Sequence, residues 1–408
     1  MKVLYFHQHF STPEGSSGIR SYSMSRCLLE RGHQVTMICG SYLGSNTGLI
    51  SPFINGKRRG MVDGIDVIEF DLTYANADGF TKRVLTFFKY ALRGLKLVFT
   101  EKYDLVFAST TPLTAGIPGI LARWLRNKPF IFEVRDLWPE LPKEMGVITN
   151  PFLLILISIL EWVSYHSAHR VIALSPGIVK GIEKRGINTD KISLVPNGCD
   201  LDIFDTKVKS WRPTEIKDTD LLVLFAGTHG IANGLDSVLD AAKELHFRKR
   251  DDIKILFLGH GKLKNSLIDR VNNEGLDNVI FHEPVDKKTL AGLMSSTDIG
   301  LQTLANISVF YYGTSPNKFF DYISAGVPVL NNYPGWLAEM INENDCGFSI
   351  PPENPNLFAD VLEQAADNRS YLKDKGLKAK ALAIEKFDRK ILASQWAESL
   401  EAVYEEKQ

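Results

Sequence analysis

The chain has 408 residues, a formal net charge of −1, and 44% hydrophobic against 23% charged residues. Because domains run to about 100–200 residues, this length predicts two domains, and the composition is that of a folded globular protein. The balanced charge gives no electrostatic case for nucleic-acid binding by the whole chain. Cys27, Cys39, Cys199 and Cys346 form no CxxC pair, so we expect a reducing compartment. The start, MKVLYFHQHF, is typical of a strand rather than a signal peptide, and we expect a cytoplasmic protein.

The first half of the chain alternates short apolar runs, rich in β-branched and aromatic residues, with longer helical patterns. Such alternation predicts a parallel sheet with helices on both faces. We expect strands at 3–6, 34–39, 67–71, 104–108, 130–134, 171–174 and 192–196, and helices that include 21–30 and 114–125.

Two helical stretches of this half depart from the usual pattern. Residues 82–100 contain five Lys or Arg and no acid. Their apolar residues share one helical face, so either that face packs on the core or the helix lies on an anionic membrane surface. Residues 151–160 are uncharged but too short to span a bilayer, which favours a buried helix over a membrane-dipping segment. The apolar face of 82–100 comprises Leu85, Phe88, Leu92, Leu95 and Phe99, beside Lys89, Arg93 and Lys96.

The stretch 200–220 is polar, charged and contains a proline, which is typical of a linker. After it the strand pattern resumes at 221–225, 254–258, 279–282, 299–304, 327–331 and 348–350. Because each side of the linker holds its own strand set, we predict two doubly wound α/β domains. Ligands of such domains bind beyond the carboxyl ends of the strands, which predicts a cleft between the two domains.

A glycine-rich turn follows the first strand of the second half. Gly227, Gly230 and Gly234 lead from a buried strand into a helical stretch. Backbone without Cβ atoms can approach a phosphate, and a helix N-terminus supplies free N–H groups. A turn needed only for packing explains these glycines equally well. The spacing differs from the G-x-G-x-x-G of dinucleotide-binding domains, which disfavours a nicotinamide dehydrogenase.

A second candidate stands at the start of a later helix, within 314–326. Lys318 and Asp321 are three residues apart near its first turn. A lysine is unfavourable at a helix N-terminus unless an anion such as a diphosphate lies nearby. Asp321 could accept hydrogen bonds from ribose hydroxyls. A solvent-exposed Lys–Asp pair accounts for the spacing equally well.

A third candidate follows the predicted strand 130–134, in the sequence FEVRDLWPE. Arg135 and Asp136 are suited to acid–base work or to binding hydroxyl groups. An ion pair of Arg135 with an acid is the structural alternative.

Turns after other strands supply weaker candidates. Gly15 and Gly18 allow close approach of an anion that Arg20 could reach, and Gly259 lies in a turn that could line the same cleft. His7 and His9 alternate along the chain without a suitably spaced third ligand, so we expect no metal and no cofactor.

The order of these segments resembles the retaining glycosyltransferases of family 4, which have the GT-B fold. The similar segments cover nearly the whole chain in the family's order. In particular the chain resembles bacterial enzymes that build O-antigen and capsule repeat units on a lipid carrier. The segments include PEGSSGIRSYSMSRCLLERGHQVTMI, FEVRDLWPE, FAGTHGIANGLD and SPNKFFDYISAGVPVL.

The resemblance implies an acceptor-binding Rossmann-like domain at 1–205, onto which the C-terminal helix 388–408 packs, and a donor-binding domain at 206–387. It implies metal-independent transfer of a sugar, an N-acetylated or deoxy hexose, from a UDP-sugar to a polyprenyl-diphosphate-linked saccharide. The basic helix 82–100 would then hold the protein on the inner face of the cytoplasmic membrane.

The resemblance also assigns roles to residues. Asp321 would contact the donor's ribose, and Asp136, preceded by Arg135 where the family has His, would lie beside the transferred sugar. Lys318 and Asp136 would be the catalytic residues. The remaining donor-binding residues would be Gly15, Gly18 and Arg20 from the first domain, and Gly227, Thr228, His229, Gly230, Asn233, Gly234, Gly259 and Asn317 from the second.

Two departures from the family pattern leave other functions open. Gly313 stands where the family has the first of two glutamates, so the resemblance does not fix the sugar. The diphosphate loop lacks the family's Arg and Lys, which places more of the charge neutralisation on Lys318. A nucleotide-sugar epimerase of the same fold, or a nucleotide-sugar-binding protein without catalysis, are the alternatives.

Overall fold

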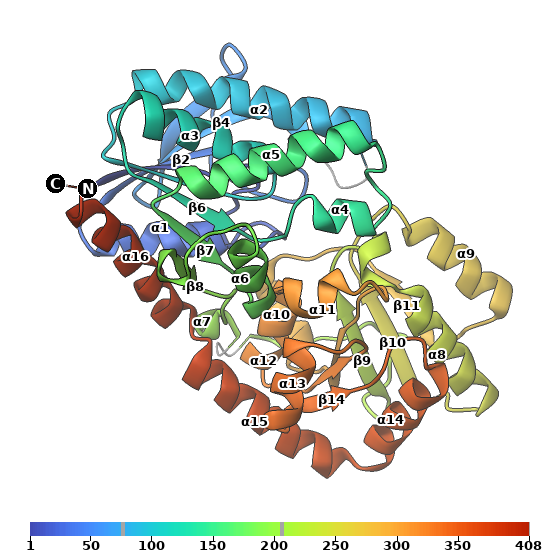
Figure 1. Cartoon of the computed structure of the whole chain (residues 1–408). Helices are drawn as coiled ribbons and strands as arrows, with labels where there is room; N and C mark the ends of the chain where they lie inside the picture. The colour runs from blue at the N-terminus through green and yellow to red at the C-terminus, as the bar shows by residue number, and fades with distance from the viewer. Residues whose placement is uncertain (75–77, 205–207, 408) are drawn as a thin grey trace. The chain divides into compact units, whose positions relative to one another are not determined.

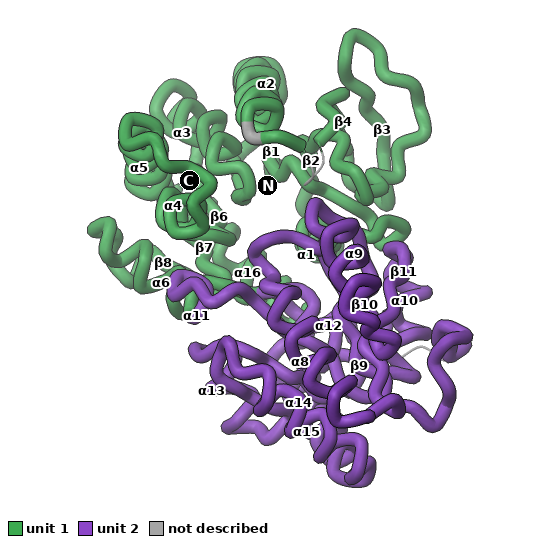
Figure 2. Tube along the Cα trace, turned by 90° about the vertical axis from the view of Figure 1, so that its right-hand side faces the viewer, with its two compact units in different colours: residues 1–197, 312–315, 389–408 green, residues 198–311, 316–388 purple. Residues whose placement is uncertain are grey.

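The computed structural model describes residues 1–74, 78–204 and 208–407 (Figure 1). It divides into two compact units, which Figure 2 colours separately. The first ends at Asn197 rather than at residue 205, and residues 205–207 of the predicted linker lie outside the described residues. Unit 1 consists of Met1–Asn197, Tyr312–Ser315 and Arg389–Gln408, and unit 2 of Gly198–Tyr311 and Pro316–Asp388.

Unit 1 is built on an eight-stranded sheet with the strand order β3-β4-β2-β1-β5-β6-β7-β8. All neighbouring strands are parallel except the edge pair β3 and β4, which is antiparallel. The sequence pattern does not predict β3, because KRRGMV is mostly polar and exposed, whereas the central strands are continuous apolar runs. The strands are β1 Lys2–Phe6, β2 Gln34–Tyr42, β3 Lys57–Val62, β4 Ile65–Tyr74, β5 Leu105–Ser109, β6 Phe130–Val134, β7 Arg170–Ala173 and β8 Ile192–Leu194.

Helices cover both faces of this sheet, as the alternating pattern predicts (Figure 1). One layer consists of α2, α3 and α5, in which α3 packs against both neighbours. On the opposite face, Trp396 of α16 stacks on Tyr5 and meets Phe107 edge to face, with ring centroids 5.9 and 4.9 Å apart. The helices are α1 Arg20–Glu30, α2 Phe80–Thr100, α3 Gly116–Leu125, α4 Glu140–Glu144, α5 Pro151–Ser167, α6 Pro176–Glu183 and α16 Arg389–Glu405, with 3-10 turns η1 Leu113–Ala115 and η2 Thr189–Lys191.

The exposed faces of α2 and α5 correct two expectations. In α2 the predicted apolar face does not pack on the core: Leu85, Phe88 and Leu92 are 54–56% exposed. The helix instead buries a second apolar face that includes Tyr90 and Val98. The helix predicted at 151–160 runs on to Ser167, and several of its large apolar side chains are exposed rather than buried.

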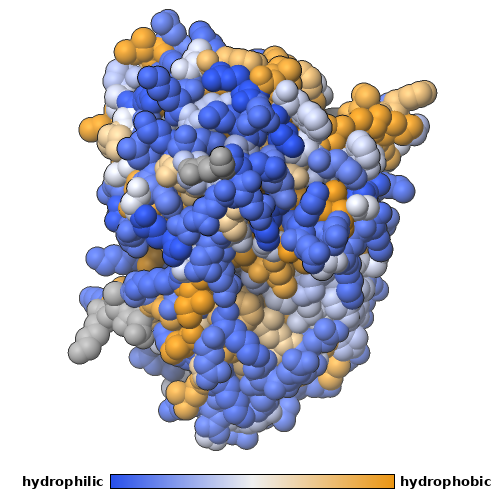
Figure 3. Space-filling model, turned by 60° about the vertical axis from the view of Figure 1, so that its left-hand side comes forward, coloured by the Kyte–Doolittle hydropathy of each residue, from blue (hydrophilic) through white to orange (hydrophobic). Residues whose placement is uncertain are grey.

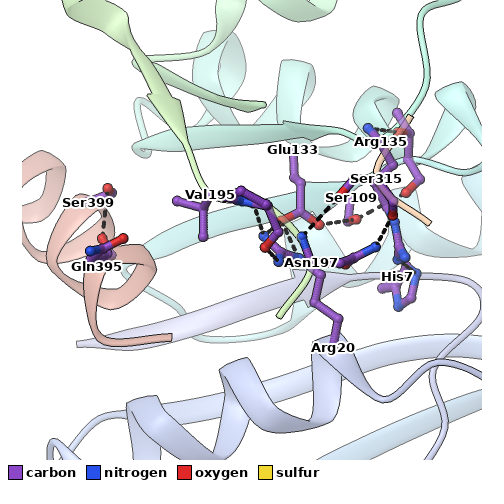
Figure 4. A network of polar contacts seen from close by, with 12 residues as sticks. His7, Arg20, Ser109, Glu133, Arg135, Val195, Asn197, Ser315, Gln395 and Ser399 are labelled. Carbon is purple, nitrogen blue, oxygen red and sulfur yellow. Dashed lines mark hydrogen bonds and ion pairs between the residues drawn. The ribbon is translucent and has the colours of Figure 1, made fainter. Parts of the chain in front are cut away.

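A short segment from the second half of the sequence, Tyr312–Ser315, belongs to unit 1. Ser175 Oγ, whose side chain also caps α6, donates to the carbonyl of Tyr312 at 2.7 Å. The backbone N–H of Asn197 donates to Ser315 Oγ at 3.0 Å, and its side-chain amide donates to the Ser315 carbonyl at 2.6 Å (Figure 4). Gly313, which replaces the first acid of the family pattern, is therefore part of unit 1.

Unit 2 repeats the architecture with a six-stranded, all-parallel sheet in the order β11-β10-β9-β12-β13-β14. The strands are β9 Leu221–Ala226, β10 Ile253–Leu258, β11 Val279–His282, β12 Ile299–Gln302, β13 Val329–Asn331 and β14 Gly347–Ser349. The helices are α7 Leu201–Phe204, α8 Asp236–Phe247, α9 Lys264–Glu274, α10 Lys287–Met294, α11 Val309–Gly313 (which runs into unit 1), α12 Asn317–Ser324, α13 Trp336–Glu343, α14 Pro355–Asp367 and α15 Arg369–Lys386, with the 3-10 turn η3 Ile231–Asn233.

The two units thus have the same doubly wound architecture. In each of them the carboxyl ends of the parallel strands meet at one edge of the sheet, which is where such folds bind ligands. Within the described ranges, no helix has both the length and the apolar character needed to cross a bilayer.

Candidate functional site

Lys318 and the glycine-rich turn after β9 lie together in unit 2. The Lys318 ammonium donates to Oδ1 of Asn233 at 2.7 Å and lies 4.3 Å from the centre of the Phe225 ring. Asn233 in turn donates through Nδ2 to the carbonyl of Thr228, also at 2.7 Å. A Cβ atom on Gly227 would stand 3.9 Å from Lys318 Cε. Two segments about 90 residues apart in the sequence therefore form one cationic turn.

The charge of Lys318 has no counterion in the described part of the chain, because its only polar side-chain contact is with the neutral amide of Asn233. Burial lowers the pKa of Lys318 to about 7. A largely desolvated ammonium of this kind is costly to the protein alone and is stabilised when an anion binds beside it. The turn is thus suited to an anionic group such as a phosphate.

Close packing explains some of the glycines of this site. A Cβ on Gly259 would lie 1.9 Å from the carbonyl oxygen of Gly227, so the two turns can pack together only if residue 259 is glycine. Gly234 has φ = 56°, and a Cβ there would meet the backbone of Ala305 at 2.8 Å. Gly230 has no such requirement, since its Cβ would meet only the Thr228 methyl at 3.6 Å. Close packing therefore explains two of the four glycines, Gly234 and Gly259, and leaves Gly227 and Gly230 without such a requirement.

The side chain of His229 is buried among aromatic rings. The ring lies among Phe225, Phe257 and Phe281, with centroids about 6 Å away. Burial lowers its pKa to about 4, so the imidazole is neutral. Its backbone N–H donates to the carbonyl of His260. Neither ring nitrogen has a hydrogen-bond partner among the described residues, and donor binding by His229 stays a prediction.

Asp321 is held by a partner that the sequence pattern did not suggest. Lys287, at the start of α10, donates from Nζ to both carboxylate oxygens of Asp321 at 2.6 Å, and both side chains are buried. The prediction that Lys318 and Asp321 form a solvent-exposed pair is therefore wrong, since Lys318 contacts Asn233 and Asp321 contacts Lys287. Asn317, which precedes Lys318, is the first residue of α12, and its side chain is half-buried. Donor binding by Asn317 stays a prediction.

In unit 1, Arg135 and Asp136 follow β6 directly. Arg135 donates from Nη1 to Nε2 of His7 at 3.1 Å, and its backbone N–H donates to Oγ1 of Thr110 at 2.8 Å (Figure 4). Burial, with Arg135 beside it, holds the pKa of His7 well below its usual range, so His7 is neutral and accepts this bond. Its other nitrogen lies 2.9 Å from Oγ of Ser21.

Asp136 accepts a hydrogen bond from Oγ1 of Thr111 at 3.2 Å, and burial raises its pKa. Neither Arg135 nor Asp136 forms a salt bridge with any residue in the described ranges. The structural alternative of an ion pair for Arg135 is therefore wrong. A guanidinium and a carboxylate without ion-pair partners at the end of a central strand are available to a polar ligand.

Arg20 is not available to a phosphate, which corrects its assignment. Its Nε and Nη2 both donate to one carboxylate oxygen of Glu133, at 3.0 and 2.8 Å, and Ser109 donates to the other at 2.7 Å (Figure 4). Nη2 also donates to the carbonyl of Val195, and Nη1 donates to that of Pro196. Because the side chains of Arg20 and Glu133 are each about 1% exposed and each guanidinium nitrogen has a hydrogen-bond partner, they form a structural ion pair.

The loop of Gly15 and Gly18, between β1 and α1, is shaped by packing at least in part. A Cβ on Gly15 would stand 2.3 Å from Oγ of Ser11 and 2.8 Å from the N–H of Asn46. Gly18 is half-buried just before α1. Donor binding by these two glycines stays a prediction.

His7 and His9 have no third metal ligand, since the described residues contain no group of three or more His, Cys, Asp or Glu that could hold a metal.

Two family models match the chain in tandem. Residues 18–203 match the model described as Glycosyltransferase Family 4, and residues 208–381 match Glycosyl transferases group 1. The chain spans about half the length of the curated relatives it matches, at 24 and 25% identity.

Solved structures with the same fold cover nearly the whole chain. Sucrose-phosphate synthase from Thermosynechococcus elongatus has a TM-score of 0.76 at 15% identity over 99% of both chains. The Anabaena protein HepE in complex with UDP-glucose has a TM-score of 0.68 at 16% identity, over 98% of this chain and 100% of that one. WaaG, a glycosyltransferase involved in lipopolysaccharide biosynthesis, has a TM-score of 0.68 at 15% identity, over 97 and 98%.

At such low identities these structures establish the fold, while the two family models identify the domains. The chain therefore belongs to the glycosyltransferases of GT-B fold that join a Family 4 domain to a group 1 domain.

Proposed function

We propose that this protein is a retaining glycosyltransferase that moves a sugar from a UDP-sugar to a lipid-linked saccharide, in the synthesis of a bacterial surface polysaccharide. The observation that carries the proposal is the Lys318 ammonium, which lies against the glycine-rich turn and has no counterion among the described residues. A sugar donor's diphosphate supplies the negative charge that this turn lacks.

Relatives of the same fold support the choice of donor and pathway. HepE is described in complex with UDP-glucose, and WaaG as a glycosyltransferase of lipopolysaccharide biosynthesis. The resemblance of the chain's motifs to enzymes of O-antigen and capsule assembly points to the same class of acceptor, a saccharide on polyprenyl diphosphate. Gly313 stands in place of the family's first acid, so this position has no side chain and no negative charge. Because a smaller, neutral residue leaves space beside the donor sugar, we propose an N-acetylated or deoxy hexose as the transferred sugar.

The proposed chemistry uses Lys318 as the residue that stabilises the leaving diphosphate. Negative charge builds on the phosphate as the bond to the sugar breaks, and a cation fixed in a poorly solvated turn stabilises that charge strongly. The acceptor hydroxyl attacks from the same face, and its proton passes to the leaving phosphate oxygen, so no strong base is required. Asp136 orients the transferred sugar or the acceptor, with Arg135 beside it.

Transfer assays with UDP-, GDP- and dTDP-sugars and a polyprenyl-diphosphate saccharide test this proposal, with the anomeric configuration of the product read by NMR. We expect a product only with acceptor present and with the configuration of the donor retained. Lys318→Ala should reduce turnover by at least about a hundredfold, the usual effect of losing one such charge-stabilising group. The matched control is Lys373→Ala, an exposed lysine of α15 in the same unit. Conversion of the UDP-sugar without an acceptor would instead identify an epimerase, and donor binding without any turnover a sensor.

A further inference from the structure

A buried ion pair joins the start of α10 to α12, the helix of unit 2 that carries Lys318. Lys287 donates from Nζ to both carboxylate oxygens of Asp321 at 2.6 Å, and the two residues are only 7 and 6% exposed. Few charged side chains of this protein are buried, and the face drawn in Figure 3 is accordingly largely hydrophilic. Because an ammonium and a carboxylate are rarely buried unless they are paired, each of these two residues depends on the other.

Stability of the fold does not by itself account for this pair. Lys287 is the first residue of α10, where the helix dipole disfavours a cation. A buried ion pair often stabilises a protein no more than well-packed apolar side chains of the same volume. The Lys287 ammonium also lies 5.6 Å from the centre of the Phe204 ring, so contacts from two helices hold it in place. The arrangement therefore fixes the position of one carboxylate and compensates its charge.

The carboxylate that Lys287 holds lies one helical turn beyond Lys318, on the helix labelled α12 in Figure 1. Residues three apart in a helix are neighbours on its surface, with Cβ atoms about 5–6 Å apart. In a nucleoside diphosphate, the 2′- and 3′-hydroxyls lie across the ribose ring from the carbon that carries the phosphates. A diphosphate bound at Lys318 can thus place its ribose diol at Asp321. The Asp321 side chain keeps 9% of its surface exposed, which lets a hydroxyl group reach it.

We propose that Lys287 is a positioning residue for donor recognition, which holds Asp321 so that this carboxylate accepts the 2′- and 3′-hydroxyls of the donor's ribose. The site thereby selects ribonucleoside diphosphate sugars over 2′-deoxyribonucleoside ones. The inference rests on the proposed function, because the ribose is that of the sugar donor. It adds Lys287 and the selection between ribose and deoxyribose, which the sequence around Asp321 does not indicate.

A direct contact of Lys287 with the diphosphate fits the geometry less well. Its ammonium already has a carboxylate partner, and its side chain is 8% exposed. Lys318, by contrast, contacts only the neutral amide of Asn233 through its polar atom. The two lysines are therefore suited to different parts of one nucleotide, Lys318 to the phosphates and Lys287, through Asp321, to the ribose.

The ratio of two dissociation constants measures the selection for ribose. Calorimetry gives the values for UDP and for 2′-deoxy-UDP with the same protein sample, so a partly unfolded sample affects both alike. Since a hydrogen bond to a charged group changes affinity by about tenfold or more, the wild type should bind 2′-deoxy-UDP at least about tenfold more weakly than UDP. A wild-type ratio near one would overturn the proposal. For a donor with another base, GDP and 2′-deoxy-GDP give the same measurement.

Substitutions of Lys287 then test its part in the ratio. Lys287→Met should reduce the ratio to about threefold or less, whereas Lys287→Arg keeps a cation beside the carboxylate and should retain most of it. The matched control is Lys375→Met, because Lys375 is another buried lysine of unit 2 and is paired with Asp345. This control should lose stability and keep the wild-type ratio. The same result in Lys287→Met would leave Lys287 with a structural role only and overturn the proposal.

A double-mutant cycle shows whether Lys287 acts through Asp321. Asp321→Asn alone should lower the ratio, and adding Lys287→Met to it should have no further effect on the ratio. The double variant buries no unpaired charge at these positions, so it should fold even where Lys287→Met alone does not. In that event Lys287→Gln takes the place of Lys287→Met in the cycle, since its amide still donates but has no charge. Additive effects of the two substitutions on the ratio would overturn the proposal.

Transfer assays separate this proposal from the proposed function. Because the ribose is remote from the bond that breaks, Lys287→Met should raise KM for the UDP-sugar by at least about tenfold and leave kcat within about threefold of the wild type. Equal transfer from a UDP-sugar and from its 2′-deoxy counterpart would overturn the selection for ribose and leave sugar transfer intact. Absence of transfer from every donor, with the expected ratio for UDP, would count against the proposed function and leave the role of Lys287 standing.

Discussion

Lys318 donates to the side-chain carbonyl of Asn233 at 2.7 Å, although about 85 residues separate them in the sequence. This bond fixes an ammonium over the glycine-rich turn, and no carboxylate in the described ranges 1–74, 78–204 and 208–407 forms an ion pair with it. The carboxylate three residues further on, Asp321, is held instead by Lys287. Lys287 and Asp321 thus form a buried pair without net charge, whereas Lys318 contacts only a neutral amide. The charge of Lys318 therefore leads to the first two predictions, on ligand binding and on stability.

Binding of UDP should depend on pH through Lys318. Its pKa near 7 means that the ammonium is charged below pH 7 and increasingly neutral above it. We therefore expect UDP affinity, measured by calorimetry, to fall between pH 6 and pH 8.5, by up to about tenfold for each pH unit above 7. Lys318→Arg keeps its charge over this range and should flatten the profile. An unchanged slope in this variant would assign the pH dependence to another group.

Lys318→Met should stabilise the free protein. Burial lowers the pKa of Lys318 in the folded state to about 7, below its unfolded value, so stability rises with pH between these two values. Removing the charge should raise the stability at pH 6 by about 1 kcal/mol or more, and by less at pH 9. Thermal unfolding at the two pH values measures this difference. The same variant should lose the stabilisation that UDP gives the wild type, and a loss of stability at pH 6 would contradict the argument.

Glu133→Gln should be among the most destabilising single changes in unit 1. It leaves the buried Arg20 guanidinium without its counterion, which costs about 3–5 kcal/mol. Although burial disfavours the carboxylate, Arg20 and Arg135 together hold the pKa of Glu133 below its usual value. The stability from this carboxylate is therefore complete above the unfolded pKa and is lost as pH falls through the folded one. Urea unfolding should show that the difference in unfolding free energy between wild type and Glu133→Gln becomes smaller below about pH 4.5.

A double variant tests whether this pair is structural. Arg20→Met with Glu133→Leu removes both charges and should be less destabilised than Glu133→Gln alone. It should keep its affinity for UDP, because every polar group of Arg20 that we describe is used within unit 1. A large loss of UDP affinity in a folded double variant would restore Arg20 to the donor site.

Asp136→Asn should separate transfer from donor binding. Asp136 contacts Thr111 and forms no salt bridge in the described structure, so the change is not expected to unfold the protein. We expect kcat to fall by at least about tenfold while UDP affinity stays within about twofold, as for a group that acts on the reacting sugar. Asp190→Asn, at an exposed position of unit 1, is the control. Equal losses of UDP affinity and turnover would place Asp136 at the nucleotide instead.

Trp396→Ala should loosen the C-terminal helix of unit 1. The indole is fully buried against Tyr5 and Phe107, and removing a buried tryptophan costs about 3–5 kcal/mol. Chemical unfolding measures the loss, and limited proteolysis should show earlier cleavage near α16. Ile391→Ala, an exposed position on the same helix, should change the stability by less than about 0.5 kcal/mol. Similar effects of the two variants would mean that α16 is not held by its tryptophan.

Local pattern was sufficient for most of the fold. Buried strands such as β5 and β9 are continuous apolar runs bounded by turn residues, and their positions follow from that local pattern alone. The edge strand β3 was missed for the same reason, because a polar, exposed strand carries no such run. The glycine-rich turn and Lys318 were also identifiable, since a lysine at a helix start and glycines after a strand are local signals.

The sequence by itself determined which residues form strands and helices and which turns contain glycine, because those properties depend on neighbours a few residues away. Only the tertiary structure decided which charged side chains pair with each other. Arg20 pairs with Glu133, 113 residues away in the sequence, and Asp321 pairs with Lys287, 34 residues away, rather than with Lys318. It also decided which apolar face of α2 is buried, since the helix has two and the sheet can cover one. The partner of a charge or of an apolar face is a residue that the fold brings close from a distant part of the chain. The neighbouring sequence therefore does not identify that partner.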